Sequence, residues 1–192
     1  MKFKCRPVIR ISAMERWKRI GRNLVHENRW FKLWANDYEV PEGKTVSPYY
    51  VIEEVDWVHV VALNEKEEVL TVRQFRPGRE IVCLELPGGA IDAGEDPLLA
   101  AQRELEEETG YTAKNWELIF SPFANPARQT NRIHCFCATD LENTGVTHFD
   151  ENEAIESEFV AIPELKLKCL NGEFPQSMHI GLLLMTLDKK GL

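Results

Sequence analysis

The sequence predicts an α/β fold in which a mixed β-sheet carries helices on both of its faces. Short apolar stretches of strand length alternate with turns through residues 57–89, and two more follow within residues 115–141. A capped amphipathic helix is expected between them at residues 97–109, and two helices are expected within residues 163–190. Strands and helices in this order are typical of a layered domain with the sheet in the middle.

Residues 1–50 are expected to form a small antiparallel β extension ahead of the main domain, residues 51–192. Aromatic side chains are spread through two stretches that the turn sequence PEGK separates. About 50 residues bury too little surface to be stable alone, so the extension should pack on the main domain or on a second subunit, and we expect a homodimer. Most of these aromatic residues are expected to pack; the alternative is that Trp30 or Trp34 stacks a nucleobase.

The main domain is expected to begin with a β-hairpin and a third strand. Residues 57–64 and 67–78 read as two strands joined by a turn around residues 64–67. Residues 81–89 follow as the next strand and a glycine-containing loop.

Three arginines, Arg73, Arg76 and Arg79, come just before this loop. Isolated arginines mostly face solvent, but in an acidic chain three of them close to one loop indicate a phosphate site, because guanidinium groups bind phosphate with paired hydrogen bonds. We expect Arg76 to matter most.

Residues 97–109 carry the start and stop signals of a helix. Asp96 is a suitable N-cap, and Pro97 suits the first helical position, where no amide donor is needed. Gly110 suits the left-handed residue that ends a helix.

One face of this helix is expected to pack on the sheet, and the neighbouring face gathers carboxylates. Glu104, Glu107 and Glu108 cluster at spacings of three and four residues. Like charges at this spacing weaken an isolated helix, and oxygen ligands are those that Mg²⁺ and Mn²⁺ prefer, so the cluster indicates a metal site. The alternative is an acidic face that only contacts solvent. The packing face comprises Leu98, Ala101, Leu105 and Thr109.

Two further strands are expected at residues 115–126 and 131–141, separated by a loop at residues 126–131. An acidic loop and another strand follow within residues 148–165. The last helix, within residues 175–190, is expected to pack through Ile180, Leu183, Leu184 and Leu187.

A run of fixed spacings extends from Gly89 to Tyr111. Five residues separate Gly89 from Glu95, and seven more separate Glu95 from Arg103. From Arg103 the run reads Arg-Glu-Leu-x-Glu-Glu-x-Gly-Tyr and ends at Tyr111, where x is any residue. This run resembles the sequence motif of the Nudix hydrolase family at every fixed position except Tyr111, where an aliphatic residue is usual. The resemblance covers about residues 51–192 and implies an α/β/α sandwich.

The Nudix resemblance implies that water attacks a phosphorus of a nucleoside diphosphate linked to another group. Metal ions neutralise the diphosphate oxygens and lower the pKa of bound water. In the family pattern the metal, Mg²⁺ or Mn²⁺, is held directly by Glu104, Glu108 and the Gly88 carbonyl. Glu107 lies beside them and is expected to contribute to the metal site, and the three glutamates count as catalytic. The remaining motif residues are structural: Gly89, Glu95, Arg103 and Gly110, with Glu95 and Arg103 expected to pair and fix the loop on the helix.

Three features resemble the ADP-ribose pyrophosphatase group of the family. Pro126 lies sixteen residues after Gly110, and residues 74–76 match an upstream Gln-aromatic-Arg triplet whose arginine contacts the diphosphate. Glu153 lies where that group has a loop glutamate that orients or deprotonates the attacking water, with Glu151 as the alternative.

This resemblance implies hydrolysis of ADP-ribose or a related nucleoside diphosphate sugar to a nucleoside monophosphate and a sugar phosphate. The residues expected to bind it are Arg73, Arg76, Glu85, Arg128 and Trp30. The stretch around Pro126 departs from the group's Ser-Pro-Gly, so GDP-mannose, a dinucleotide or a modified nucleoside triphosphate is the alternative substrate. A nucleotide-sensing module without turnover is another alternative, although retained glutamates favour catalysis.

Composition argues against several other classes of function. The net charge of −8 argues against general binding to nucleic acid or membranes, and no apolar run of about 18 residues is present. The first residues lack a continuous apolar segment, so we expect no signal peptide and a cytoplasmic protein. Five cysteines without a CxxC pair fit reduced thiols. The five scattered histidines are expected to be structural or surface residues, with His148 the one to test.

Overall fold

Three strands make up the N-terminal part of the computed structural model, which describes residues 16–145, 147 and 154–192. Strands β1 (Lys18–Glu27), β2 (Phe31–Glu39) and β3 (Thr45–Glu54) form a sheet in that order, and a short 3₁₀ helix, η1 (Pro41–Gly43), lies in the PEGK turn. The stretch before PEGK is divided into β1 and β2 by a turn in which Asn28 Oδ1 accepts hydrogen bonds from the N–H groups of Trp30 and Phe31.

The chain divides into two units, Met1–Glu53 and Glu54–Leu192, and the second contains the glycine loop and its helix. The roles expected of the N-terminal unit, dimerisation and base stacking, stay predictions. No helix among the described residues is long and apolar enough to cross a membrane.

The second unit is built on a mixed sheet, as predicted. Its strands are β4 (Trp57–Leu63), β5 (Glu68–Arg76), β6 (Ile81–Glu85), β7 (Tyr111–Phe120), β8 (Ile133–Asn143) and β9 (Glu156–Ala161). Their order is β6-β5-β4-β8-β7, with β9 paired to β5. Strands β4 and β8 run parallel, and the other pairs are antiparallel.

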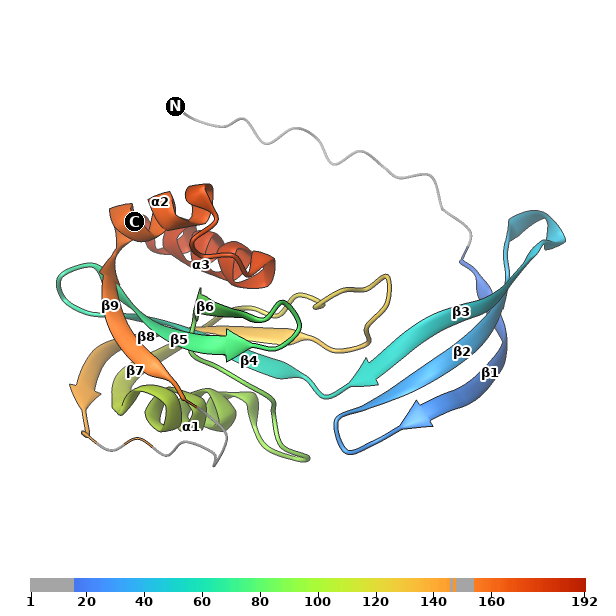
Figure 1. Ribbon diagram of the computed structural model, residues 1–192, viewed down its shortest axis with the longest axis horizontal. Helices are drawn as coiled ribbons and strands as arrows, with labels where there is room; N and C mark the ends of the chain where they lie inside the picture. The colour runs from blue at the N-terminus through green and yellow to red at the C-terminus, as the bar shows by residue number, and fades with distance from the viewer. Residues whose placement is uncertain (1–15, 146, 148–153) are drawn as a thin grey trace. The chain divides into compact units, whose positions relative to one another are not determined.

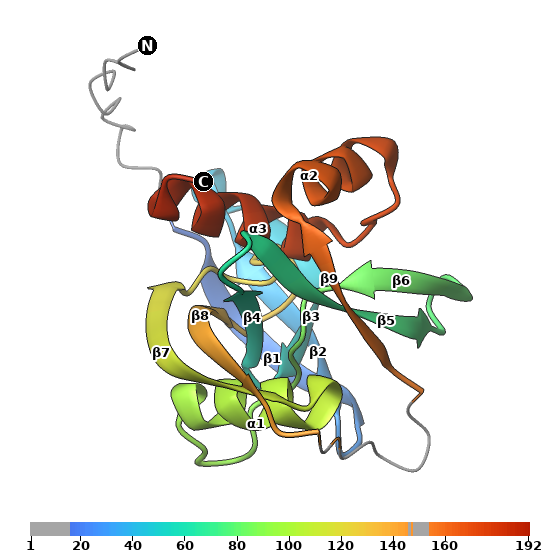
Figure 2. The same ribbon diagram turned by 90° about the vertical axis from the view of Figure 1, so that its left-hand side faces the viewer.

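Helices cover both faces of this sheet (Figures 1 and 2). Helix α1 (Pro97–Thr109) lies on one face, and α2 (Ile162–Asn171) and α3 (Ser177–Lys190) lie on the other. Because successive side chains of a strand point to opposite faces, Val60 of β4 packs with the α1 side and Val61 packs with the α2 and α3 side. Strand β4 therefore contributes to both halves of the core.

The predicted boundaries of α1 are confirmed. Asp96 Oδ1 accepts a hydrogen bond of 2.9 Å from the N–H of Leu98, and Gly110 ends the helix in the left-handed conformation at φ 70°. Ala101 and Leu105 are fully buried on the sheet.

Two expectations are wrong in detail. Strand β7 covers Tyr111–Phe120 rather than residues 115–126, because Pro122 has no N–H for the β-ladder and residues 121–132 form a loop instead. Leu184, expected to pack, is 42% exposed, whereas its neighbours Leu182 and Leu183 are buried.

Candidate active site

The loop between β6 and α1 runs along β4 with no room for a side chain at Gly88. The N–H groups of Val58 and Val60 donate to the carbonyls of Gly89 and Pro87, both at 2.9 Å. Gly88 has φ 147°, and a Cβ there would lie 2.1 Å from the Val58 carbonyl oxygen. Only glycine fits this position.

Two glutamates of α1 reach this loop. Glu108 is 7% exposed, and its Oε2 accepts a hydrogen bond of 2.8 Å from the N–H of Gly88. Glu104 lies against Gly89, where an added Cβ would be 2.6 Å from Glu104 Oε1. A spacing of four residues puts both side chains on one helix face, so both carboxylates meet the same short backbone segment.

Arg103 connects the acidic side chains of the helix and loop. Its Nε and Nη2 donate to Glu95, both at 3.0 Å, and its Nη1 donates to Glu104 at 2.8 Å and Glu107 at 3.0 Å. The hydrogen bonds from Arg103 lower the pKa of Glu95, and those to Glu95 in turn raise the pKa of Arg103. Glu95, whose Oε2 also accepts the N–H of Asp92, thereby ties the loop to the helix.

The carboxylate oxygens of Glu108 and Glu104, which lie at Gly88 and Gly89, suit a hard divalent cation. Among the described residues, no three acidic, histidine or cysteine side chains converge as a ready-made metal centre, and Glu107 contacts Arg103 instead. Mg²⁺ needs fewer protein ligands, because it keeps several waters and is often bound by one or two carboxylates together with substrate phosphates. Glu104 and Glu108 are two such carboxylates.

Arg76 is held at the end of β5 by a buried carboxylate. Its Nε and Nη2 lie 3.0 and 2.5 Å from Glu85 Oε2, and Glu85 is 1% exposed. This paired geometry fixes the plane of the guanidinium group. Arg73 instead pairs with Glu158 of β9 at 2.5 Å, and Arg79 is exposed in the turn after β5.

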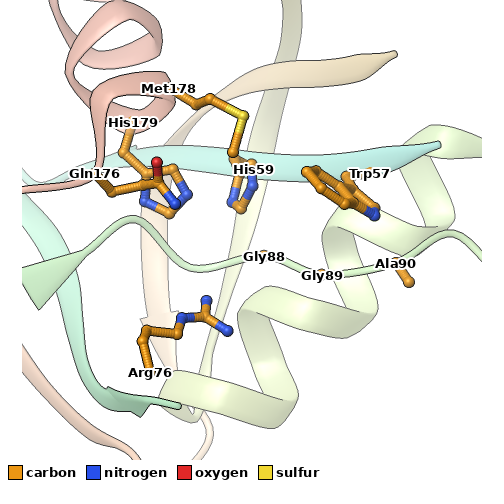
Figure 3. A pocket seen from close by; sticks show the side chains of 9 residues that line it. All are labelled: Trp57, His59, Arg76, Gly88, Gly89, Ala90, Gln176, Met178 and His179. Carbon is orange, nitrogen blue, oxygen red and sulfur yellow. The ribbon is translucent and has the colours of Figure 1, made fainter. Parts of the chain in front are cut away.

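A cavity of about 330 Å³ lies beside the glycine loop. Figure 3 shows the rings of His59 and His179 next to one another, with the backbone of the loop and Arg76 below them. Its lining comprises Trp57, His59, Arg76, Gly88, Gly89, Ala90, Gln176, Met178 and His179.

Both cavity histidines are buried and uncharged. Burial, with a smaller effect of Arg76, lowers the pKa of His59 to about 4. Burial also lowers the pKa of His179 well below its ordinary value. The Nδ1 atom of His179 accepts a hydrogen bond of 3.1 Å from the N–H of Leu86.

The family model of the NUDIX domain matches residues 54–178, which include this loop, the helix and every residue that lines the cavity except His179. The chain belongs to the Nudix family. It is similar to an ADP-ribose pyrophosphatase of Bacillus subtilis (strain 168), with 32% identity over 151 residues, which is 79% of each chain. It is also similar to a methanol dehydrogenase activator of Bacillus methanolicus, with 34% identity over 152 residues and 78% of each chain.

A solved structure supports the Nudix fold. The crystal structure of an ADP compounds hydrolase superposes with a TM-score of 0.80 and covers 94% of this chain and 98% of its own. At 20% identity this likeness shows the shared fold.

The residues predicted to bind substrate in this Nudix hydrolase lie in different places. Arg76 lines the cavity, with Glu85 behind it. Arg128 is exposed in the loop at residues 121–132. Trp30 belongs to the N-terminal unit, where it is 64% exposed in the β1–β2 turn. The proposed water-activating residues, Glu153 and Glu151, and also His148, lie outside the described residues.

From the sequence, the two cavity histidines were expected to be structural or surface residues, and both are buried; that they line one cavity together was not predicted. A signal was present, because His59 is the one histidine within the apolar run of β4 and shares a strand face with Trp57 and Val61. His179 stands at the start of an apolar helix, but nothing in the sequence brings residue 179 next to residue 59.

Proposed function

We propose that this Nudix hydrolase cleaves the diphosphate bond of ADP-ribose or a related nucleoside diphosphate sugar with the help of Mg²⁺ or Mn²⁺. The products are a nucleoside monophosphate and a sugar phosphate. The observation that carries the proposal is the placement of Glu104 and Glu108 against Gly88 and Gly89, two glycines that line a cavity together with Arg76.

Glu104 and Glu108, with the carbonyl of Gly88, are the residues that we propose hold the cation. When bound, the metal neutralises the diphosphate oxygens and makes water a better nucleophile. Glu107 is exposed on 37% of its side chain and bonded to Arg103, so we assign it a supporting part. Glu153 is proposed, from its sequence position, to accept the proton of the attacking water.

Arg76 is proposed to bind the diphosphate. Its bonds to Glu85 use Nε and Nη2, and we assign Nη1 to a phosphate oxygen. Because Glu85 fixes the guanidinium group before substrate arrives, little side-chain freedom is lost on binding. Glu85 is thus a positioning residue for Arg76.

The choice of substrate is supported by the Bacillus subtilis relative and by the sequence features around Arg76 and Pro126. A relative of similar identity is named as a methanol dehydrogenase activator, so the substrate is best decided by a direct comparison. We expect the highest kcat/KM for ADP-ribose in a panel that also contains GDP-mannose, a dinucleotide and a nucleoside triphosphate.

The panel is run on the full chain with Mg²⁺ or Mn²⁺, and the products are separated by chromatography. AMP and ribose 5-phosphate should appear in equal amounts, and excess chelator should abolish their formation, because the uncompensated diphosphate repels hydroxide. A higher kcat/KM for another member of the panel, or turnover that persists in chelator, contradicts the proposal.

A further inference from the structure

Two buried imidazoles line the cavity beside the glycine loop, and the proposed reaction does not use them. His59 is 5% exposed and His179 is 1% exposed, and their ring centroids lie 4.2 Å apart. They come from β4 and α3, and Figure 3 shows the two rings side by side at the cavity. Burying a polar group is unfavourable unless it forms hydrogen bonds, so each ring nitrogen is expected to have a partner.

One hydrogen bond determines which ring nitrogen of His179 is left to bind a ligand. Its Nδ1 accepts the N–H of Leu86, so Nδ1 carries no proton. In a neutral imidazole the proton is then on Nε2, which is a donor. The remaining polar group of His179 is therefore an N–H.

His59 has unused hydrogen-bonding capacity. Its Nδ1 is buried and has no hydrogen-bond partner within the described residues. A neutral imidazole has one donor and one acceptor nitrogen, so the two rings together can give and receive hydrogen bonds. Nδ1 is covered by the loop, since a Cβ at Gly88 would lie 2.6 Å from it, so the ring nitrogen that we assign to a ligand in the cavity is Nε2.

The other walls of the cavity combine apolar side chains, the amide of Gln176 and the groups beside the proposed diphosphate site. Trp57 and Met178 are half-buried and supply the apolar surface, while Arg76 and the Gly88–Gly89 backbone connect the cavity to the proposed diphosphate site. Its volume of about 330 Å³ is at the lower end for ligand sites, so one ring fits rather than a whole nucleotide sugar. A hydroxyl group both donates and accepts, which matches a pair of neutral imidazoles.

We propose that this cavity binds the sugar ring attached directly to the diphosphate, and that His59 and His179 are specificity-determining residues that hydrogen bond to its hydroxyl groups. The inference rests on the proposed function, because Arg76 and the glycine loop place the diphosphate at the edge of the cavity. The sugar of the sugar phosphate and the ribose of the nucleoside share this chemistry, and separate ligands distinguish them.

The test measures binding of ribose 5-phosphate and of AMP to the full chain by titration calorimetry with Mg²⁺. The variant is His59→Phe, because a phenyl ring is close to the imidazole in shape and removes both ring nitrogens from the cavity wall. The matched control is His134→Phe, an imidazole of β8 that contacts Ser121 and Asp56 outside the cavity. If His59→Phe does not fold by circular dichroism, Gln176→Leu at the same cavity replaces it.

We expect His59→Phe to raise the Kd of ribose 5-phosphate by about fivefold or more, and His134→Phe to change it by less than about twofold. An unchanged Kd for AMP assigns the cavity to the sugar phosphate half, and a parallel rise assigns it to a ribose of either half. The inference is overturned if ribose 5-phosphate does not bind, or if its Kd does not respond to His59→Phe or its replacement.

These binding measurements, together with the ADP-ribose hydrolysis assay of the substrate panel, separate this inference from the proposed function. If ribose 5-phosphate binds and responds to His59→Phe while ADP-ribose is not hydrolysed, the sugar site stands and the proposed reaction fails. If ADP-ribose is hydrolysed and the Kd of ribose 5-phosphate is the same for His59→Phe and wild type, the proposed sugar site is refuted while the proposed reaction stands.

Discussion

Gly88 and Gly89 are adjacent in the chain, yet a side chain at each would meet a different obstacle. At Gly88 the obstacle is rigid, because a Cβ would lie 2.1 Å from the Val58 carbonyl oxygen and the backbone has φ 147°. At Gly89 the obstacle is the movable end of a side chain, since a Cβ would lie 2.6 Å from Glu104 Oε1. The first glycine is therefore required for the fold and the second for the position of a carboxylate.

Alanine at each position should separate these two roles. Gly88→Ala should lower the free energy of unfolding by about 1–3 kcal/mol, because the clash involves backbone. Gly89→Ala should change stability by less than about 1 kcal/mol and reduce kcat by about tenfold or more, because it displaces Glu104. Urea unfolding and steady-state kinetics measure both, with Gly78→Ala, which has open space around it, as the control. Equal effects of Gly88→Ala and Gly89→Ala on stability would refute this distinction.

Individual side chains were predictable where a local rule governs them. The four-residue spacing predicted that Glu104 and Glu108 share a helix face, and both reach the glycine loop. The same rule did not reveal that Arg103 bonds to Glu104 and Glu107 as well as Glu95, because the direction of a long side chain depends on three-dimensional neighbours.

Helix and strand boundaries were likewise predictable where neighbouring residues determine them, and not where residues far along the chain do. The limits of α1 were predicted to the residue, since Asp96, Pro97 and Gly110 act within one turn. Strand β7 was misplaced because its start at Tyr111 depends on pairing with Asn143 of β8, which lies far along the chain. The contact between β4 and α3 through the rings of His59 and His179 was not predicted for the same reason.

This contact between β4 and α3 should make stability depend on pH. In the unfolded chain His59 has its ordinary pKa of 6.5, and in the folded protein burial lowers the pKa to about 4. Between these values the unfolded state binds more protons, so the free energy of unfolding decreases as pH falls from 6.5, and the His59 contribution is fully lost below about pH 4. Its size is about 3 kcal/mol from the pKa difference.

Urea unfolding of wild type and His59→Phe at several pH values between 7 and about 4 measures this contribution. The variant lacks the titrating ring, so its stability should fall less steeply over this range, while carboxylates contribute equally to both proteins. Two curves with the same slope would mean that His59 is not buried as an uncharged ring.

At the scale of the whole molecule, β4 connects the two halves of the proposed site. One of its faces packs with α1, which carries Glu104 and Glu108, and the other carries His59 toward α3. The glycine loop hydrogen bonds to Val58 and Val60 of β4, so the carboxylates and the cavity meet at one backbone segment. The mixed sheet and its helices were predictable from the order of elements, whereas the cavity was not, because it is built from β4, β5, the loop and α3 together.

The most direct test of the central claim is the hydrolysis of ADP-ribose by Glu108→Gln, with AMP formation measured in the presence of Mg²⁺. Glu106→Gln, on the same helix, is the matched control. We predict that Glu108→Gln lowers kcat by about a hundredfold or more at unchanged folding, whereas Glu106→Gln stays near wild type. A fall of less than about tenfold for Glu108→Gln, roughly 1.4 kcal/mol of activation free energy, would contradict the assignment of this carboxylate to the reaction.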